Sequence, residues 1–156
     1  MLAKAIVAFL ALPGVVAFLL PGALLLATNR INLAQPAGLA ALAFGLVGLL
    51  WCVRDFYVAG KGTLAPWAPP ERLVVVGLYR YCRNPMYASV GVLLLGWAVS
   101  FASPVLFAYS LFVAIAFHVR VVLREELWLE RMHGQAWQEY CASVPRWFYL
   151  RPKNAP

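Results

Sequence analysis

The sequence has few charged side chains, and acidic residues are the rarest of them. Only 6 of the 156 residues are Asp or Glu, and 13 are Lys or Arg. Charged residues make up 12% of the chain and apolar residues 63%, whereas soluble domains average about 25% and about 45–50%. This composition excludes intrinsic disorder and argues against a soluble domain. We therefore predict a single membrane domain over residues 1–156.

Cysteine and histidine are also scarce, with three and two residues respectively. Cys52, Cys82 and Cys141 form no CxxC pair and no Cys/His spacing of the kind that binds zinc, so we predict free thiols and no metal site. In a soluble protein the excess of Lys and Arg would suggest nucleic-acid binding. In a membrane protein such residues gather on the cytosolic side, next to anionic lipid, and we predict no nucleic-acid partner.

Uncharged runs in the first half of the chain predict two membrane spans. Residues 5–28 carry no charge and exceed the roughly 20 apolar residues that cross a bilayer. Two Pro-Gly pairs, at 13–14 and 21–22, predict a kinked or broken helix there. The run is longer than the apolar part of a cleaved signal peptide, about 7–15 residues. A second span is predicted at 37–55, where glycine and alanine allow close helix packing.

The second half of the chain holds a longer uncharged run. From Asn84 to Val119 there are 36 consecutive residues without a charge. As one helix they would measure about 54 Å, against a hydrocarbon core of about 30 Å. The run must therefore break, and Ser100–Pro104 is the segment with suitable residues. This predicts spans at about 86–101 and 104–122, joined by a hairpin.

The predicted fold class is thus an all-α integral membrane protein with about four transmembrane helices and a cytosolic amphipathic C-terminal helix within 123–141. This segment is predicted to continue the fourth span, with Gly134 as a break or the start of a new turn. Basic residues are concentrated in 54–83 and from Arg120 onward, whereas the 100–104 hairpin has none. Because Lys and Arg mark the cytosolic side, both segments are predicted there. With four spans, the N-terminus lies on that side as well. A bacterial inner membrane or an endoplasmic reticulum fits this multi-pass topology.

Polar residues gather at two places, 79–87 before the third predicted span and 118–146 at the end of the fourth. Since these spans form a hairpin, both clusters meet at one membrane surface and predict a site. Pro85 suits the first turn of a helix with Asn84 as its N-cap, and such a helix start can bind an anionic group. The alternative is a capped helix in which Arg83 and Tyr87 only anchor the chain at the interface.

The second cluster contains the adjacent acids Glu125 and Glu126, where the fourth span leaves the membrane. Acidic residues contribute little to topology, so orientation does not explain them. The alternative to a functional role is a solvated face paired with basic neighbours, namely Arg120, Arg124 and Arg131. The histidines are interpreted as a polar residue of the bundle, His118, and a surface residue, His133.

The two clusters carry two motifs. The first is Gly77-x-Tyr79-x-x-x-Arg83-Asn84-Pro85-x-Tyr87, and the second is Glu125-Glu126, Gly134-x-x-Trp137-x-x-Tyr140 and Val144-x-Arg146. Together, over residues 71–150, they resemble the membrane methyltransferases typified by isoprenylcysteine carboxyl methyltransferase and phospholipid N-methyltransferases. Two positions differ from that family. Many prenylcysteine enzymes have His where this chain has Asn84, and this chain has Tyr149 where a proline is expected.

The resemblance implies an S-adenosylmethionine site on the cytosolic side. The residues it assigns to the cofactor are Leu73, Val74, Tyr79, Asn84, Pro85, Met86, Tyr87, Glu125 and Glu126. It also implies a lipophilic or lipidated acceptor from the membrane, first the carboxylate of a prenylcysteine or isoprenoid-like substrate. A phospholipid amine or a thiol is the alternative acceptor.

Catalytic roles for Arg120, Arg146 and Glu126 follow from the chemistry of these acceptors. Arg120 or Arg146 could hold an acceptor carboxylate. An amine acceptor must lose a proton, for which Glu126 is the candidate base. Two other readings remain open at this point. One is an NADPH-dependent membrane reductase, since sterol reductases resemble this family near their C-terminal ends, and the other is a non-catalytic membrane subunit. An oligomer is possible without support from any motif.

Overall fold

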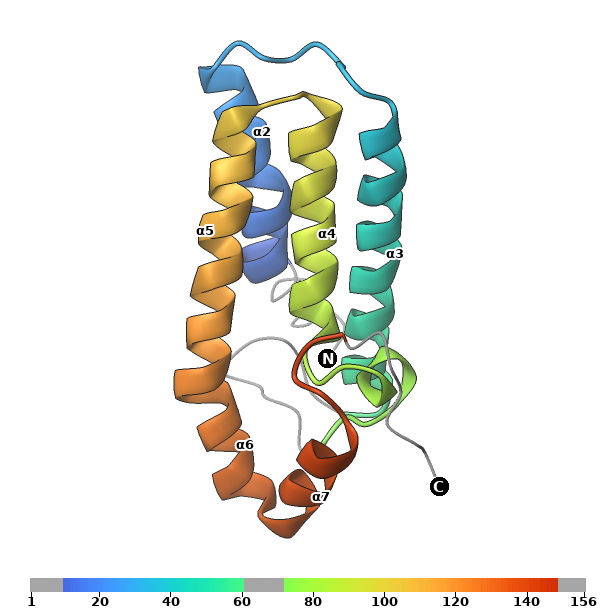
Figure 1. Cartoon of the computed structure of the whole chain (residues 1–156). Coiled ribbons are helices and arrows are strands. Elements are labelled where there is room, and N and C mark those ends of the chain that lie inside the picture. The colour runs from blue at the N-terminus through green and yellow to red at the C-terminus, as the bar shows by residue number, and fades with distance from the viewer. Residues whose placement is uncertain (1–9, 61–71, 149–156) are drawn as a thin grey trace.

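The computed structural model describes residues 10–60 and 72–148, and its regular elements there are all helical (Figure 1). This confirms the predicted all-helical class. Residues 5–9 of the first predicted span, residues 61–71 and Tyr149 lie outside the described residues. The elements are η1 (Leu10–Leu19), α2 (Leu20–Ala27), α3 (Ala37–Val58), η2 (Gly77–Arg80), α4 (Pro85–Ser100), α5 (Pro104–Arg120), η3 (Val121–Glu125), α6 (Glu126–His133) and α7 (Gln135–Ser143).

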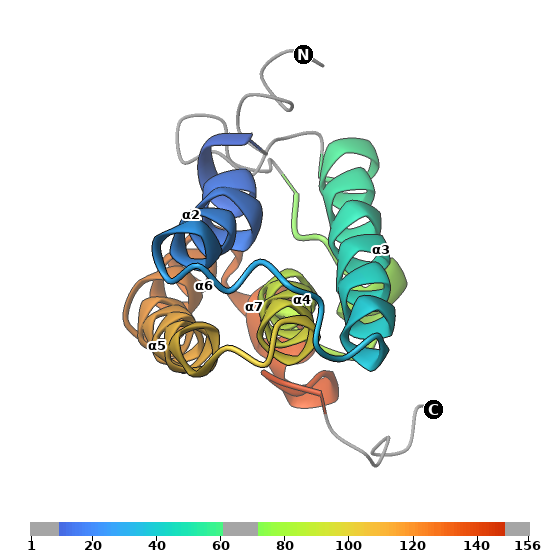
Figure 2. The same cartoon turned by 90° about the horizontal axis from the view of Figure 1, so that it is seen from above.

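Helices α2 to α5 run side by side as a bundle, and α4 lies between α3 and α5 (Figures 1 and 2). Glycines allow α3 and α4 to approach closely. A Cβ added at Gly45 would lie 2.6 Å from the backbone nitrogen of Leu93, and one at Gly96 would lie 2.6 Å from that of Leu42. The small residues predicted to permit helix pairing therefore pair α3 with α4 inside the molecule.

The long uncharged run breaks where the sequence predicts it. Helix α4 ends at Ser100 and α5 begins at Pro104. Ser103 is the N-cap of α5, and its hydroxyl accepts a hydrogen bond from the Leu106 N–H at 3.4 Å. Proline suits the following position because its missing N–H would have no partner in the first helical turn.

The N-terminal helix changes from π-helical to α-helical turns between Leu19 and Leu20. Pro21 lacks the N–H that would otherwise pair with a carbonyl one turn earlier. The carbonyls of Val16 and Ala17, about one turn before Pro21, accept hydrogen bonds from side chains of α4 and α5 instead. Trp97 of α4 donates to Ala17 O at 3.0 Å, and Tyr109 of α5 donates to Val16 O at 2.9 Å. These bonds attach the first helix to the rest of the bundle.

Two helices of the described residues are long and apolar enough to cross a membrane, Ala37–Val58 with 22 residues and Pro104–His133 with 30. Shorter apolar helices, Pro13–Ala27 and Pro85–Ser100, stand where the other two spans are predicted. Large apolar side chains on the two long helices are exposed, such as Phe44 of α3 at 82% and Phe112 of α5 at 69%. Exposed apolar surface of this kind marks contact with a membrane or a partner, and here it indicates a membrane protein.

Helix α5 continues through η3 into α6 as one uninterrupted helical segment (Figure 1). Gly134, predicted as a break within the amphipathic segment 123–141, divides that segment into α6 and α7 and has a positive φ of 50°. Glycine reaches that conformation without the steric cost of a Cβ. The turn directs α7 back beneath α4, where η2, α6 and α7 form one end of the molecule (Figure 1).

Candidate functional site

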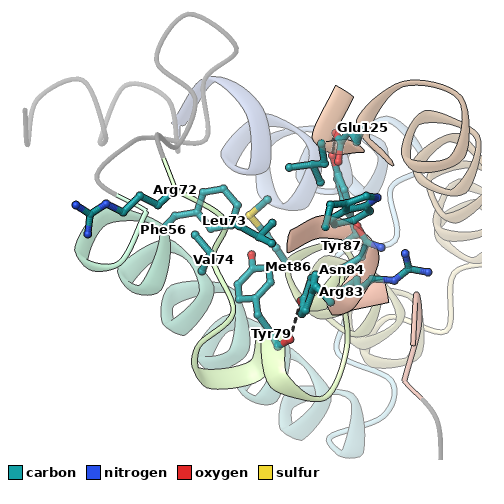
Figure 3. A pocket seen from close by; sticks show the side chains of 13 residues that line it. Phe56, Arg72, Leu73, Val74, Tyr79, Arg83, Asn84, Met86, Tyr87 and Glu125 are labelled. Carbon is teal, nitrogen blue, oxygen red and sulfur yellow. Dashed lines mark hydrogen bonds between the residues drawn. The ribbon is translucent and has the colours of Figure 1, made fainter. Parts of the chain in front are cut away.

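A pocket lined by both apolar and polar side chains lies at this end of the bundle, among the end of α3, η2, the start of α4, η3 and the helices α6 and α7 (Figure 3). Its volume is about 80 Å³. The lining residues are Phe56, Arg72, Leu73, Val74, Tyr79, Arg83, Asn84, Met86, Tyr87, Glu125, Leu129, Trp137 and Tyr140. The two sequence clusters therefore meet in space around one cavity.

Seven of the residues predicted to hold a cofactor line this pocket: Leu73, Val74, Tyr79, Asn84, Met86, Tyr87 and Glu125. The other two, Pro85 and Glu126, do not line it, and neither do Arg120 and Arg146. Trp137 and Tyr140 carry a motif signal and line the pocket as well. Phe56 and Leu129 also line it, and nothing in their local sequence singles them out.

Tyr79 is placed by the short helix η2. Gly77, with a φ of 58°, starts this turn, and a Cβ there would collide with the carboxylate of Asp55. Tyr79 is buried, and its carbonyl accepts a hydrogen bond from the Tyr140 hydroxyl at 2.6 Å. Burial raises the pKa of both phenols well above their usual range, so both are neutral at physiological pH.

Asn84 stands at the N-cap position of α4 as predicted, but its side chain makes no cap hydrogen bond. Its amide instead donates to the Arg146 carbonyl at 3.1 Å. The Arg83 N–H donates to Pro145 O at 2.9 Å, and the Cys82 thiol donates to Arg146 O at 3.4 Å. The segment 144–147 is therefore fastened across the start of α4.

Glu125 joins the two clusters directly. Its Oε1 accepts a hydrogen bond from the Tyr87 hydroxyl and another from Arg120 Nε at 2.7 Å. Arg120 and Glu125 are five residues apart, and the π-helical turn of η3 brings residues at that spacing together. Both contacts use Oε1, which leaves Oε2 able to accept a bond from a ligand in the pocket.

Glu126 faces a different set of partners. Arg146 binds it through two parallel bonds of 2.8 and 2.7 Å, and Arg83 Nη1 lies 3.3 Å from its Oε1. Arg83 also donates to the Cys141 sulfur and lies over the Trp137 ring at 5.5 Å. The bond to Glu126 raises the pKa of Arg146. This cluster joins α6, α7 and segment 144–147 to the start of α4.

The sequence left open that Glu125 and Glu126 form a solvated face paired with basic neighbours, and the structure shows which of these pairs exist. Of the three predicted basic partners, Arg120 forms an ion pair with Glu125, while Arg124 and Arg131 form none within the described part of the chain. Arg83, predicted as an interface anchor or a site residue, lies in the pocket with its side chain 12% exposed.

The chain was compared with known protein families, curated proteins and solved structures. The model of a family described as phospholipid methyltransferase matches residues 33–136. The matched range runs from the loop before α3 to the first turn of α7, and it includes the pocket-lining residues other than Trp137 and Tyr140. No curated protein and no solved structure matches the chain.

Proposed function

Since the chain belongs to the phospholipid methyltransferase family, we propose that it is a membrane enzyme that transfers a methyl group from S-adenosylmethionine to a lipophilic acceptor. The observation that carries this proposal is the convergence of Asn84, Tyr87 and Glu125 on one pocket between α4 and η3. When bound, S-adenosylmethionine supplies an activated methyl group on a positively charged sulfur.

The chemistry of the pocket fits such a cofactor. Leu73, Val74 and Met86 offer an apolar wall for a flat ring, and Oε2 of Glu125 offers an acceptor for an ammonium or hydroxyl group. Ligand pockets usually measure about 300–1,000 Å³, so this one must widen on binding. Segment 144–147 does not line the pocket, but the lining residue Asn84 donates to the Arg146 carbonyl, and we propose that this segment moves as the pocket widens.

We assign positioning roles to three of the predicted residues. Arg120 orients the Glu125 carboxylate, because its Nε bonds the same oxygen as Tyr87. Glu126 and Arg146 bind each other and hold segment 144–147. Both oxygens of Glu126 are engaged by arginines, so we do not assign Glu126 the role of proton acceptor for an amine substrate.

A lipid amine is the first acceptor we propose, and a prenylcysteine or isoprenoid carboxylate the second. The family match supports a lipid acceptor, and Asn84 stands where many prenylcysteine enzymes have His. We also propose that all four apolar helices cross the membrane, with η2, α6 and α7 at its cytosolic surface. The basic residues of 54–83 and of the chain after Arg120 support that orientation.

The proposal is tested by calorimetry on the purified protein in detergent, with S-adenosylmethionine and NADPH as parallel ligands. We expect binding of S-adenosylmethionine alone, weakened at least tenfold by Glu125→Gln, which removes a charged acceptor. Glu139→Gln is the matched control, because Glu139 is an exposed acid of α7 outside the pocket. Binding of NADPH alone would support the reductase reading instead. Methyl transfer to lipid amines and to prenylcysteine analogues then separates the acceptors.

A further inference from the structure

A second pocket, larger and apolar, lies between α4 and α5. It is lined by Tyr87, Ala88, Gly91, Val113, Ala114, Phe117, His118 and Trp147, and its volume is about 320 Å³. We call it the α4–α5 groove. Tyr87 lines both this groove and the proposed cofactor pocket, so the two cavities share a wall. Helices α4 and α5 are neighbours along this whole stretch (Figures 1 and 2).

The groove exists because its middle is lined by small residues. Ala88 and Gly91 of α4 face Ala114 of α5 across it. A Cβ added at Gly91 would meet no heavy atom within 4 Å, so the space beside α4 at this point is open. An apolar cavity of roughly 150 Å³ can hold benzene. By that measure the groove holds on the order of a dozen carbon atoms, which is one chain and not two.

The two ends of the groove differ in polarity. At one end the Trp147 indole donates to Nδ1 of His118 at 3.2 Å, which leaves the proton of a neutral His118 on Nε2 as a hydrogen-bond donor. The Tyr87 and Phe117 rings lie 4.4 Å apart at the same level. Gly91 lies about one helical turn further along α4, towards the apolar middle of the bundle. A ligand with a polar head and a hydrocarbon tail fits this polarity in one direction only.

We propose that the α4–α5 groove holds one hydrocarbon chain of the methyl acceptor, and that the absence of a side chain at Gly91 sets how far this chain reaches. The inference rests on the proposed function. A chain lying in the groove with its head towards His118 brings that head to Tyr87, which is also a wall of the proposed cofactor pocket. The acceptor class is therefore a lipid that inserts a single chain, with any second chain left in the bilayer.

The test uses the whole protein in lipid nanodiscs and a palmitic acid analogue with a photoreactive diazirine in the middle of its chain. Cross-linked peptides are identified by mass spectrometry. The variant is Gly91→Leu, which fills the groove without an overlap at its Cβ. The matched control is Gly22→Leu in α2, because a Cβ at Gly22 also meets no heavy atom within 4 Å. Cofactor binding by calorimetry is measured on the same samples.

We expect the unmodified protein to be labelled on α4 and α5 around Gly91 and Ala114. Gly91→Leu is expected to lower this labelling about tenfold, because several methylene contacts are lost, and Gly22→Leu to leave it unchanged. Ala114→Leu fills the groove from α5 and should give the same loss, which guards against a folding defect in one variant. Labelling elsewhere, or equal labelling in the groove variants, overturns the inference.

The two proposals fail separately in this experiment. Cofactor binding without labelling of the groove contradicts the inference and leaves the proposed function standing. Labelling of the groove by a protein that binds no S-adenosylmethionine contradicts the proposed function, and with it the assignment of the chain to a methyl acceptor. Loss of both labelling and methyl transfer in Gly91→Leu, with cofactor binding retained, supports both.

Discussion

Tyr140 of α7 donates its hydroxyl hydrogen to the carbonyl of Tyr79, 61 residues earlier in the chain, at 2.6 Å. Both residues are buried. This bond connects the C-terminal helix to the turn that leads into α4, and it satisfies a carbonyl that has no access to water. The geometry of the pocket therefore depends on a contact between its two sequence clusters.

Replacing Tyr140 by Phe removes this hydrogen bond and leaves the Tyr79 carbonyl buried without it. An unsatisfied buried acceptor costs about 1–3 kcal/mol, so we expect Tyr140→Phe to lower the free energy of unfolding by about that amount. The measurement is thermal or denaturant unfolding in detergent. Tyr57→Phe is the control, since Tyr57 is 42% exposed on α3. Equal stability of the two variants would contradict this role of the bond.

Close contact between α3 and α4 gives a second prediction. A Cβ at Gly45 would lie 2.6 Å from the backbone nitrogen of Leu93, which forces the two helices apart. Overpacking of this kind typically costs about 1–3 kcal/mol, so Gly45→Ala should be destabilised although alanine favours helix formation. Gly22→Ala, at a helical glycine with open space around it, should be neutral or slightly stabilising. The measurement is the unfolding midpoint of each variant compared with that of the unmodified protein. An undiminished midpoint for Gly45→Ala would show that α3 and α4 can separate at low cost in free energy.

Much of the fold could be predicted because its signals are local. The break between Ser100 and Pro104 follows from helix length and from the residues that start α5. The pairing of Glu126 with Arg83 and Arg146 could not be predicted, because it depends on the path of the chain after Gly134. The π-helical turn of η3 has no sequence signature, yet it decides that Arg120 meets Glu125.

The pocket-lining residues also divide into those that the sequence could predict and those that only the packing reveals. Residues within motifs, such as Tyr79, Tyr87 and Glu125, were predicted to lie together and do line one cavity. Phe56 and Leu129 line it only because α3 ends and α6 begins at the same level of the bundle. Nothing in their neighbourhood distinguishes them from the other apolar residues of the chain, so only the packing of the helices identifies them.

The contact between Arg120 and Glu125 predicts a measurable change in cofactor affinity. Arg120→Ala leaves Glu125 with Tyr87 as its described partner, so the carboxylate becomes less well oriented towards the pocket. Because Arg120 is half exposed, we expect a modest loss, about two- to fivefold in the dissociation constant for S-adenosylmethionine. Arg124→Ala removes an exposed charge of the same turn that makes no ion pair among the described residues, and it should bind as the unmodified protein does. If both variants bind equally well, Arg120 does not orient Glu125.

The buried thiol of Cys82 predicts a loss of stability in alkaline solution. Burial raises the pKa of Cys82 from 9.0 to about 11, so the folded protein holds this proton more tightly than the unfolded chain does. The contribution of the Cys82 thiol to the free energy of unfolding is complete below pH 9 and disappears as the pH rises through about 11. We expect the unfolding temperature in detergent to fall over this range, and the fall to be smaller in Cys82→Ala. Tyr79 and Tyr140 also have raised pKa values and add the same alkaline loss to both proteins, so the difference between the two curves isolates the thiol. Parallel curves would mean that Cys82 ionises no differently in the folded and unfolded chain.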